Sequence, residues 1–507
     1  MTEWLTLVQP RHPGRVCGIA GVWDVNQPEL VAGMLSGLVH RGPDAEGLVD
    51  LDGRGTLGHR RLSIVDLAGG DQPFVTGNDA LVANGEIYNA PDLRAELSRS
   101  RRFASRSDNE VILHLLAEEG PAAVRRLRGM FAFALASDGE LLLGRDPIGI
   151  KPLYRGQLGD SLVFSSELRT LPAGTTDVTP IEPGTVWSDR TGTSRYYEIP
   201  DPDPEPGDLH HHARRVRTAL ETSVVRRLMA DVPIGAFLSG GLDSSAIVAL
   251  IRRHVPELHT FSVGLPGSPD LEAARAVSRH VGTIHHEHVI DPDEIVEHLP
   301  EIVLALESYD QDLVRSAVPT FFTARLAAQH VKVVMTGEGA DELFAGYEYH
   351  KDLARPDDIH ADARRSLGEL HHVNLQRVDR LTMAHSLEAR VPFLDLDLIE
   401  VALAIPPELR QPGEGAPEKA VLRHAVEHLL PAEIVWRDKA QFDQGSGTAD
   451  LLPELSLGAG IDVDAYRADH PGARLRSAEE CWYHQLLVSA LPDPELVLVN
   501  VARWTDR

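Results

Sequence analysis

The second half of the chain alternates short apolar runs with helical patterns, and this alternation constrains the fold more than any other feature. Residues 213–230 have helical spacing, and residues 233–241 then indicate a buried strand that runs into a glycine turn. The alternation continues through helical segments 243–254 and 271–282 and strand-like segments 259–265 and 331–337. Strands that alternate with helices form βαβ units, so we expect a parallel sheet covered by helices.

The first 195 residues show a different pattern, in which short apolar runs are separated by glycine, aspartate and proline turns. Helical spacing at residues 91–100 and 108–120 indicates an α+β unit with a sheet core. Residues 199–209 repeat proline and acidic residues, which disfavour both a helix and a paired strand. We therefore predict one domain over residues 17–195, a linker over 196–209 and a second domain over 210–507.

Length and charge exclude several classes of protein. With 507 residues, the chain exceeds the roughly 250–300 residues at which single cores stop growing. Two cysteines are too few for a disulfide framework, and no apolar run reaches the roughly 20 residues that span a bilayer. A formal net charge of −27 opposes general binding to nucleic acid. These features indicate a cytoplasmic protein that binds neither nucleic acid nor membrane.

The segment LSGGLDSS, residues 238–245, lies where a predicted strand ends and a predicted helix begins. Glycines let the backbone approach a ligand, and a helix N-terminus attracts anions, so this turn suits phosphate groups. A plain glycine turn with a Ser or Asp N-cap is the alternative for so short a motif. The whole string resembles the pyrophosphate loop of ATP pyrophosphatases, which implies that Asp243 holds Mg²⁺ on the departing pyrophosphate.

A second acidic cluster, GEGADELFAGY at residues 337–347, follows the predicted strand 331–337. We expect Glu338 and Asp341 at the carboxyl edge of the parallel sheet, where such folds bind ligands. Acidic residues also favour an ordinary helix start, which is the alternative. In the segment WRDKAQF, Lys439 can stabilise charge on a phosphate or on a tetrahedral intermediate, whereas a solitary lysine is normally a solvated surface residue.

Segments from Cys17 to about Gly447 follow the order seen in one family: RGPD, HRRLSIVD, NGEIYN, SDNEVI, GMFAFAL, GRDPIGIKPLY, SGGLDSS, FSVGLPGSPDLEAA, TGEGADELFAGY, EARVPFLD and WRDKAQF. In this order the chain resembles the glutamine-dependent asparagine synthetases. The resemblance implies an N-terminal αββα sandwich of the N-terminal-nucleophile hydrolase type and a C-terminal parallel-sheet α/β domain of the ATP-pyrophosphatase, or adenine nucleotide α-hydrolase-like, type. It also implies that ammonia passes between the domains through an internal channel.

The resemblance further implies an activity and its partners. Glutamine is hydrolysed to ammonia, ATP adenylates the side-chain carboxylate of aspartate, and asparagine, AMP and pyrophosphate are formed with Mg²⁺. A homodimer is compatible with these features, which do not fix the oligomeric state.

The family assigns a role to Cys17, whose thiolate attacks the glutamine amide while its free α-amine transfers protons. A small buried hydrophobe is the alternative for a free cysteine. Asn84 and the Gly85 N–H are implied as the oxyanion hole. The residues implied to bind glutamine are Arg61, Ile64, Val65, Asn84, Glu86 and Asp108.

The synthetase half carries the remaining implied residues. Glu338 and Lys439 are implied as catalytic, and Asp243 and Asp341 as Mg²⁺ ligands. Arg315, Glu338 and Asp341 are implied to contact the acceptor or the intermediate. The residues implied to bind ATP or pyrophosphate are Leu238, Ser239, Gly240, Gly241, Asp243, Ser244, Ser245, Val263, Thr336 and Gly337.

Sixteen residues precede Cys17, whereas the family has only an initiator Met there. We expect residues 1–16 to be absent from the mature enzyme, because either this extension is cleaved or the start is misassigned. Val16 favours the second explanation, since a valine codon GTG can serve as a bacterial start.

One segment that concerns the acceptor departs from the family pattern. Where the closest recognised synthetases have two threonines before an arginine, this chain has Asp312 and Leu313 before Arg315. An ionised Asp312 repels an anionic substrate unless a cation intervenes, so aspartate remains the default and another carboxylic acid in specialised biosynthesis is the alternative. A β-lactam synthetase or lasso-peptide cyclase is a further alternative, although these relatives have usually lost the cysteine. A binding protein with a decayed site is opposed by the intact motifs.

Two histidine runs, residues 210–212 and residues 285–288, lack zinc-site spacing. We expect neither to bind a metal, and we expect the first run to be solvated.

Overall fold

The computed structural model describes residues 17–353, 355–410, 417–439, 442–501 and 503–504. The predicted extension 1–16, with Val16, lies outside the described residues, as do Ala440 and Gln441 of the WRDKAQF segment.

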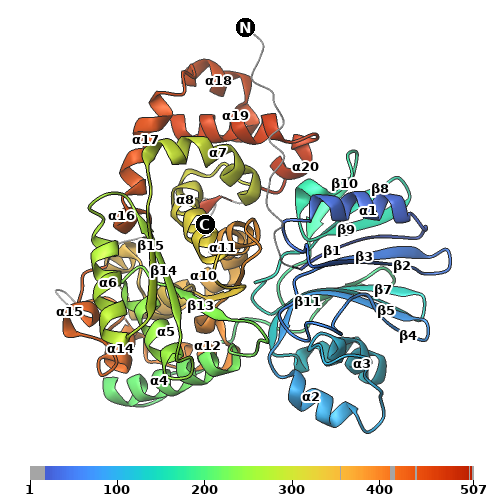
Figure 1. Cartoon of the computed structure of the whole chain (residues 1–507), viewed down its shortest axis with the longest axis horizontal. Helices are drawn as coiled ribbons and strands as arrows, with labels where there is room; N and C mark the ends of the chain where they lie inside the picture. Colours follow the sequence, from blue (N-terminus) through green and yellow to red (C-terminus); the bar gives the residue numbers. More distant parts are fainter. Residues whose placement is uncertain (1–16, 354, 411–416, 440–441, 502, 505–507) are drawn as a thin grey trace.

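Residues 18–195 form two six-stranded antiparallel sheets (Figure 1). The first sheet has the strand order β10 (Thr176–Pro180), β8 (Tyr154–Leu158), β9 (Ser161–Ser165), β1 (Gly18–Trp23), β3 (Gly55–Arg61) and β2 (Ala45–Asp50). The second has the order β12 (Gly192–Arg195), β11 (Thr185–Ser188), β7 (Glu140–Arg145), β6 (Gly129–Ser137), β5 (Asp79–Ile87) and β4 (Phe74–Thr76).

The two sheets pack face to face, and successive side chains along a strand point alternately into the core between the sheets and toward the outer helices. In β1, Ile19 packs into the core between the sheets, whereas Ala20 faces the helix α1 (Pro28–Gly37). In β5, Val82 enters the same central core, whereas Ala83 faces α2 (Ala90–Leu97) and α3 (Glu110–Glu119). The layers therefore run helix, sheet, sheet, helix, which confirms the predicted αββα sandwich.

The second domain is built on a five-stranded sheet in which every strand pair is parallel. Its order is β15 (Ile284–Val289), β14 (His259–Gly264), β13 (Ile234–Phe237), β16 (Val333–Met335) and β17 (Glu388–Arg390). The helices that link the first strands are α5 (Leu242–Arg252), α6 (Pro269–Val281), α7 (Pro292–Leu306) and α8 (Gln311–Ala327). This alternation confirms the predicted parallel α/β fold.

Helices cover both faces of this sheet. In β16, Val334 packs against residues of α8 and of α11 (Asn374–Met383), whereas its neighbours Val333 and Met335 pack into the cluster that contains α5. The other helices are α4 (Leu209–Arg226), α9 (Ala340–Phe344), α10 (Pro356–Glu369), α12 (Leu396–Leu403), α13 (Pro407–Arg410), α14 (Ala420–Val426), α15 (Ala432–Val435), α16 (Phe442–Ser446), α17 (Thr448–Leu457), α18 (Val463–Asp469), α19 (Ala478–Ala490) and α20 (Pro494–Leu498).

The histidine run 210–212 lies in the first turn of α4, which begins four residues before the predicted helix because Asp208 caps it by accepting the His211 N–H at 2.7 Å. His212 is buried in this turn, so the expectation that the whole run is solvated was wrong.

A buried charge cluster joins the two domains. The guanidinium of Arg41 lies 2.8 Å from Asp379 of α11 and 3.0 Å from Glu167, both as nitrogen–oxygen distances. Arg380 lies 3.1 Å from Glu167 and 2.9 Å from Glu307. All five side chains are almost fully buried, and an unpaired buried charge is costly, so these pairs fix the domains against each other.

None of the helices in the described part of the chain is both long enough and apolar enough to cross a membrane.

Two candidate active sites

Cys17 lies directly before β1, at the edge where the first domain meets the second. Its Sγ accepts a hydrogen bond from the Leu62 N–H at 3.3 Å, and its carbonyl accepts one from Arg41 at 3.2 Å. Burial raises the pKa of the Cys17 thiol to about 12. A thiol with so high a pKa is a poor nucleophile unless a base removes its proton, so this cysteine needs a neighbouring amine or a similar group to react.

Asn84 and Gly85, the predicted oxyanion-hole residues, lie near the end of β5. Both the Nδ2 and the Oδ1 of Asn84 are buried without a hydrogen-bond partner. Burying an amide without a hydrogen-bond partner costs free energy, and such a group is typical of a ligand-binding site. Gly85 has φ +134°, and a Cβ there would lie 1.9 Å from the Met130 carbonyl oxygen, so only glycine fits this position.

Two carboxyl groups lie beside this amide. Asp108 accepts the Ile87 N–H at 2.6 Å, and burial raises its pKa to about 6. Burial raises the pKa of Glu86 as well, and the nearby Asp108 adds to this shift. The pair is therefore short of positive charge, and an ammonium group would relieve their repulsion. Arg390 of β17, in the second domain, supplies part of the missing positive charge, because its nitrogen lies 3.4 Å from the Glu86 carboxylate.

The remaining predicted glutamine-binding residues are held by the loop after β3. Arg61 pairs with Asp71 at 2.7 Å and donates to the Asp66 carbonyl at 2.6 Å. The Val65 carbonyl accepts from Arg61 at 3.3 Å, and the Ile64 carbonyl accepts the Asp231 N–H at 2.9 Å. Asp71 is mostly exposed, so its pairing with Arg61 can yield to a substrate carboxylate.

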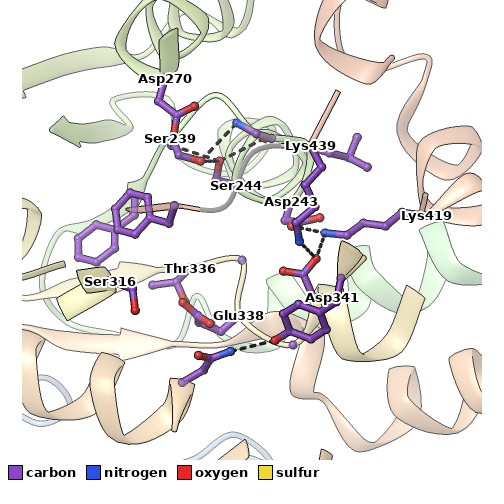
Figure 2. Close-up of a pocket in the computed structure, with 18 of the residues that line it drawn as sticks. Ser239, Asp243, Ser244, Asp270, Ser316, Thr336, Glu338, Asp341, Lys419 and Lys439 are labelled. Carbon is purple, nitrogen blue, oxygen red and sulfur yellow. Dashed lines mark hydrogen bonds and ion pairs between the residues drawn. The ribbon is translucent and has the colours of Figure 1, made fainter. Parts of the chain in front are cut away.

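The second site is a cavity of about 580 Å³ at the carboxyl ends of β13, β14 and β16 (Figure 2). Doubly wound sheets bind ligands at this edge. Most of the predicted ATP-binding residues line it, namely Leu238, Ser239, Gly241, Asp243, Ser244, Val263, Thr336 and Gly337. Gly240 and Ser245 complete the loop without lining the cavity, and the Ser245 hydroxyl is buried without a partner.

The turn before α5 is fixed by hydrogen bonds among its own residues. The Ser239 N–H donates to the Ser244 hydroxyl at 3.2 Å, and the Gly241 N–H donates to the Ser239 hydroxyl at 3.3 Å. Gly240 has φ +76°, and a Cβ there would lie 2.5 Å from the backbone of Ala274 in α6. The glycine therefore lets the turn lie against α6 while the N-terminus of α5 faces the cavity.

Two lysines and two aspartates form the charged end of this cavity, and Figure 2 shows Lys419 reaching both carboxylates. The Lys419 Nζ lies 2.5 Å from Asp243 and 2.6 Å from Asp341, and Lys439 also pairs with Asp341. Burial opposes the charge on Asp341, but Lys419 and Lys439 hold its pKa below the usual range.

This arrangement is compatible with a bound Mg²⁺. One ammonium contacts both aspartates, so the two carboxylates lie close enough to share one cation. The Oδ1 of Asp243 is buried without a partner, which leaves a hard oxygen ligand available.

Glu338 and its partner lie on another wall of the cavity. Arg377 of α11 contacts the Glu338 carboxylate at 2.6 Å, yet burial raises the pKa of Glu338 above its ordinary value. Burial and the charge of Asp341 also raise the pKa of Glu342 to about 7. Carboxyl groups with raised pKa values can exchange protons near neutral pH.

Arg315 is the predicted site residue that the structure does not bring to the cavity. Its guanidinium pairs with Glu479 of α19 through two contacts, at 3.0 and 2.5 Å. Asp312 and Leu313 do line the cavity, and Asp312 lies 3.3 Å from Arg476 and 3.9 Å from Arg315. Two cations therefore accompany Asp312, one from its own helix and one from the C-terminal part of the chain.

Sequence reasoning missed several residues that line the cavity. Lys419, Arg377 and Trp504 come from segments in which no local motif marked them. Lys419 directly precedes α14 in a left-handed backbone conformation, with φ +57°. Its amine donates to Asp243 in the first turn of α5, 176 residues earlier in the chain. Only contacts between distant segments identify such a residue.

Comparisons with known proteins show the family to which the chain belongs. Residues 16–195 match the glutamine amidotransferase domain family, and residues 215–367 and 352–459 match the asparagine synthase family. The chain is 37% identical to asparagine synthetase B (glutamine-hydrolysing) of Escherichia coli K12, in an alignment that covers 94% of this chain and 92% of the relative. It is 40% identical to a probable glutamine-hydrolysing asparagine synthetase of Schizosaccharomyces pombe, over 93% of this chain and 91% of the relative. The chain therefore belongs to the family of glutamine-hydrolysing asparagine synthetases.

Proposed function

We propose that this protein makes an amide in two coupled steps, hydrolysing glutamine in the first domain and using the released ammonia in the second. The observation that carries the proposal is the contact of one buried ammonium, Lys419, with both Asp243 and Asp341 in front of the anion-binding turn. This supports a site for a polyphosphate with its cation. The first domain supplies the thiol of Cys17 and, near the end of β5, the unpaired amide of Asn84.

In the first domain, the Cys17 thiolate attacks the glutamine amide carbon. The bond to nitrogen breaks, ammonia leaves, and a γ-glutamyl thioester remains, which water then hydrolyses to glutamate. The α-amine of Cys17 takes the thiol proton and returns it to the leaving nitrogen, so this role requires Cys17 to be the first residue. Asn84 and the Gly85 N–H would stabilise the oxyanion, while Glu86 and Asp108 would bind the substrate ammonium.

In the second domain, a carboxylate oxygen of the acceptor attacks the α-phosphorus of ATP, and pyrophosphate leaves. Ammonia then attacks the acyl carbon, and AMP leaves to give the amide. The anion-binding turn and Lys439 would hold the phosphates, and Glu338 would accept a proton from the attacking ammonia. Asp243 and Asp341 would hold Mg²⁺, which neutralises the departing pyrophosphate.

Aspartate is the first acceptor to test, because the relatives are asparagine synthetases. A second acceptor is supported by one observation, the presence of Asp312 and Leu313 in the lining while Arg315 is paired with Glu479. Arg476 and Arg315 offset the charge of Asp312. The apolar Leu313, rather than a net negative charge, therefore distinguishes this part of the lining.

The test is incubation of the enzyme with ATP, Mg²⁺, glutamine and a panel of carboxylic acids, with pyrophosphate and new amides followed by mass. Brisk asparagine formation would support the default and dismiss another acceptor. Turnover of a different acid without turnover of aspartate would dismiss the default. Pyrophosphate release that needs neither glutamine nor ammonia would instead indicate a cyclase that uses an internal amine, and no release with any acid would contradict the synthetase.

A further inference from the structure

Three histidines from separate elements meet at the end of the parallel sheet that lies away from the cavity. His259 is the first residue of β14, His286 lies in the neighbouring strand β15, and His330 lies in the turn between α8 and β16. One ring nitrogen from each residue lies within 4.8 Å of the others. The closest pair, His259 Nδ1 and His286 Nε2, is 2.9 Å apart.

The rings are held in this arrangement by packing. His286 stacks on His330 with ring centroids 3.9 Å apart, and Phe261, which is fully buried, lies 5.2 Å from His286 and 5.8 Å from His330. Among the ion pairs of the described residues, none joins any of these three rings to a carboxylate. Their nitrogens therefore have each other as neighbours rather than an acidic partner.

This cluster lies behind one wall of the nucleotide cavity. The three histidines are not among the lining residues, but Phe261, which lines the cavity, has its ring centroid 5.2 Å from that of His286. Phe261 is two residues further along β14 than His259, which is roughly 7 Å along the strand. A ligand at the histidines would therefore contact the sheet and would be linked to the nucleotide cavity through Phe261.

Neutral imidazoles are the commonest nitrogen ligands of Zn²⁺, with bonds of about 2.0–2.1 Å. Two nitrogens on one tetrahedral ion consequently lie roughly 3.4 Å apart. Because His286 and His330 stack with ring centroids 3.9 Å apart, the exposed ring of His330 has to turn out of the stack before both rings face one ion.

We propose that His259, His286 and His330 bind one divalent transition-metal ion, with Zn²⁺ as the best match and water in the fourth position. The hydrogen bond between His259 and His286 gives way when the ion enters. Its proton moves to the other nitrogen of the same ring, so both facing nitrogens can bind the ion. The ion would cross-link β14, β15 and the turn before β16.

The sequence did not indicate this site. His286 belongs to the run 285–288, which we expected not to bind a metal because it lacks zinc-site spacing. Its partner His259 is 27 residues away in the chain, and the sheet register brings the two together. Spacing rules detect ligands that one loop supplies, whereas here three elements supply one ligand each.

The experiment uses the full-length protein without an affinity tag, because a histidine tag would itself bind metal. After treatment with EDTA and dialysis, Zn²⁺ is added, free metal is removed, and the bound metal is measured by mass spectrometry. Co²⁺ is used in parallel, because its visible absorption reports nitrogen coordination. We expect about one ion per chain and a higher thermal midpoint with Zn²⁺ than without it.

Variants localise the ion. His286→Asn and the more exposed His330→Asn should each weaken metal binding at least about tenfold and remove the thermal shift, with folding checked by circular dichroism. His254→Asn, on the surface after α5, and His210→Asn, in the other histidine run, are matched controls that should retain the ion. Absence of bound metal in the wild type, or equal retention in His286→Asn and His330→Asn, would overturn the proposal. Loss in His210→Asn alone would assign the ion to the other run and would also overturn it.

Discussion

At the residue scale, burial raises the pKa of acidic side chains in both sites, but the neighbours of these side chains differ. Asp108 and Asp270 both have pKa values raised to about 6, chiefly by burial, but the first lies beside Glu86 and the second pairs with Arg437 in the nucleotide cavity. A carboxyl with a raised pKa favours the folded state at low pH, and this contribution is lost as the pH rises through about 6.

The binding of glutamine should therefore depend on pH in a predictable direction. An ammonium group binds to ionised Asp108, so the KM for glutamine should fall as the pH rises from about 5 to about 7. Asp108→Asn should raise the KM and weaken this dependence, to which Glu86 also contributes, as measured by glutamate release. Asp270→Asn is the control, because it removes a carboxyl of similar pKa from the other domain, and an equal loss of the pH dependence there would contradict this assignment.

The nitrogen supply should depend on a single atom of the chain. Cys17→Ala removes the Sγ that lies 3.3 Å from the Leu62 amide. Glutamine-dependent synthesis should then fall at least about 10³-fold, while synthesis from ammonium chloride should stay within a few-fold of the wild type. Product is measured with each nitrogen source in the same preparation. Undiminished synthesis from glutamine would remove Cys17 from the mechanism.

A change at Asp243 should have the opposite effect to the change at Cys17: adenylation should fall while glutamine hydrolysis continues. Asp243→Asn keeps the shape of the side chain but removes the charge that Lys419 contacts at 2.5 Å. We expect the release of AMP and pyrophosphate to fall by about 10²-fold or more, and glutamine hydrolysis to continue. Pyrophosphate release is followed with ammonia as the nitrogen source, so that the first domain plays no part. A normal rate would mean that the turn before α5 does not hold the reacting phosphates.

At the scale of elements, hydrophobic patterning predicted β13, β14 and β16 of the parallel sheet but not β15 and β17, and the αββα sandwich was expected only from the family resemblance. The helices predicted at residues 243–254 and 271–282 correspond to α5 and α6, whose ends differ by two residues or fewer. Motifs that follow a strand, such as SGGLDSS, also lie where the alternation predicts, because the carboxyl ends of parallel strands share one edge. Lys419 and the three histidines were missed because their neighbours come from distant segments. A single sequence does not show how the strands pair or which distant segments lie side by side.

One glycine tests the link between strand geometry and the first site. Gly85→Ala would place a Cβ 1.9 Å from the Met130 carbonyl in a backbone conformation, φ +134°, that alanine rarely adopts. We expect the free energy of unfolding to fall by at least about 2 kcal/mol and glutamine hydrolysis to be lost.

The control for this change is a glycine that the fold does not require. Gly33→Ala, in the exposed face of α1, meets nothing within 4 Å. It should leave activity unchanged and stabilise the fold by about 0.5–1 kcal/mol. Denaturant unfolding of both variants gives the comparison, and a Gly85→Ala protein as stable as the wild type would contradict the strand geometry.

At the scale of the whole molecule, charged groups of each domain complete sites and cores of the other. Arg41 of the first domain pairs with Asp379 of the second, and Arg390 of the second approaches Glu86 of the first. Both arginines are fully buried. Removing one partner of such a pair leaves a buried charge without compensation, so changes at this interface should reach the neighbouring site.

Arg390 provides the clearest test of this coupling. It lies in β17 of the synthetase domain, 2.9 Å from Glu388 and 3.4 Å from Glu86, and donates to the carbonyls of Arg227 and Met229. Arg390→Met removes the cation that favours ionised Glu86, so the KM for glutamine should rise about tenfold or more.

The same substitution should change synthesis from ammonia by no more than a few-fold, because the nucleotide cavity keeps its charged groups. Arg390→Lys should recover part of the glutamine affinity, since it restores the charge without the planar fork. Lys332→Met is the matched control, because Lys332 pairs across the domains with Asp44 at 2.9 Å in a partly exposed position and should have little effect. Equal losses of both activities in Arg390→Met, without recovery in Arg390→Lys, would mean that Arg390 holds the fold together and does not tune the glutamine site.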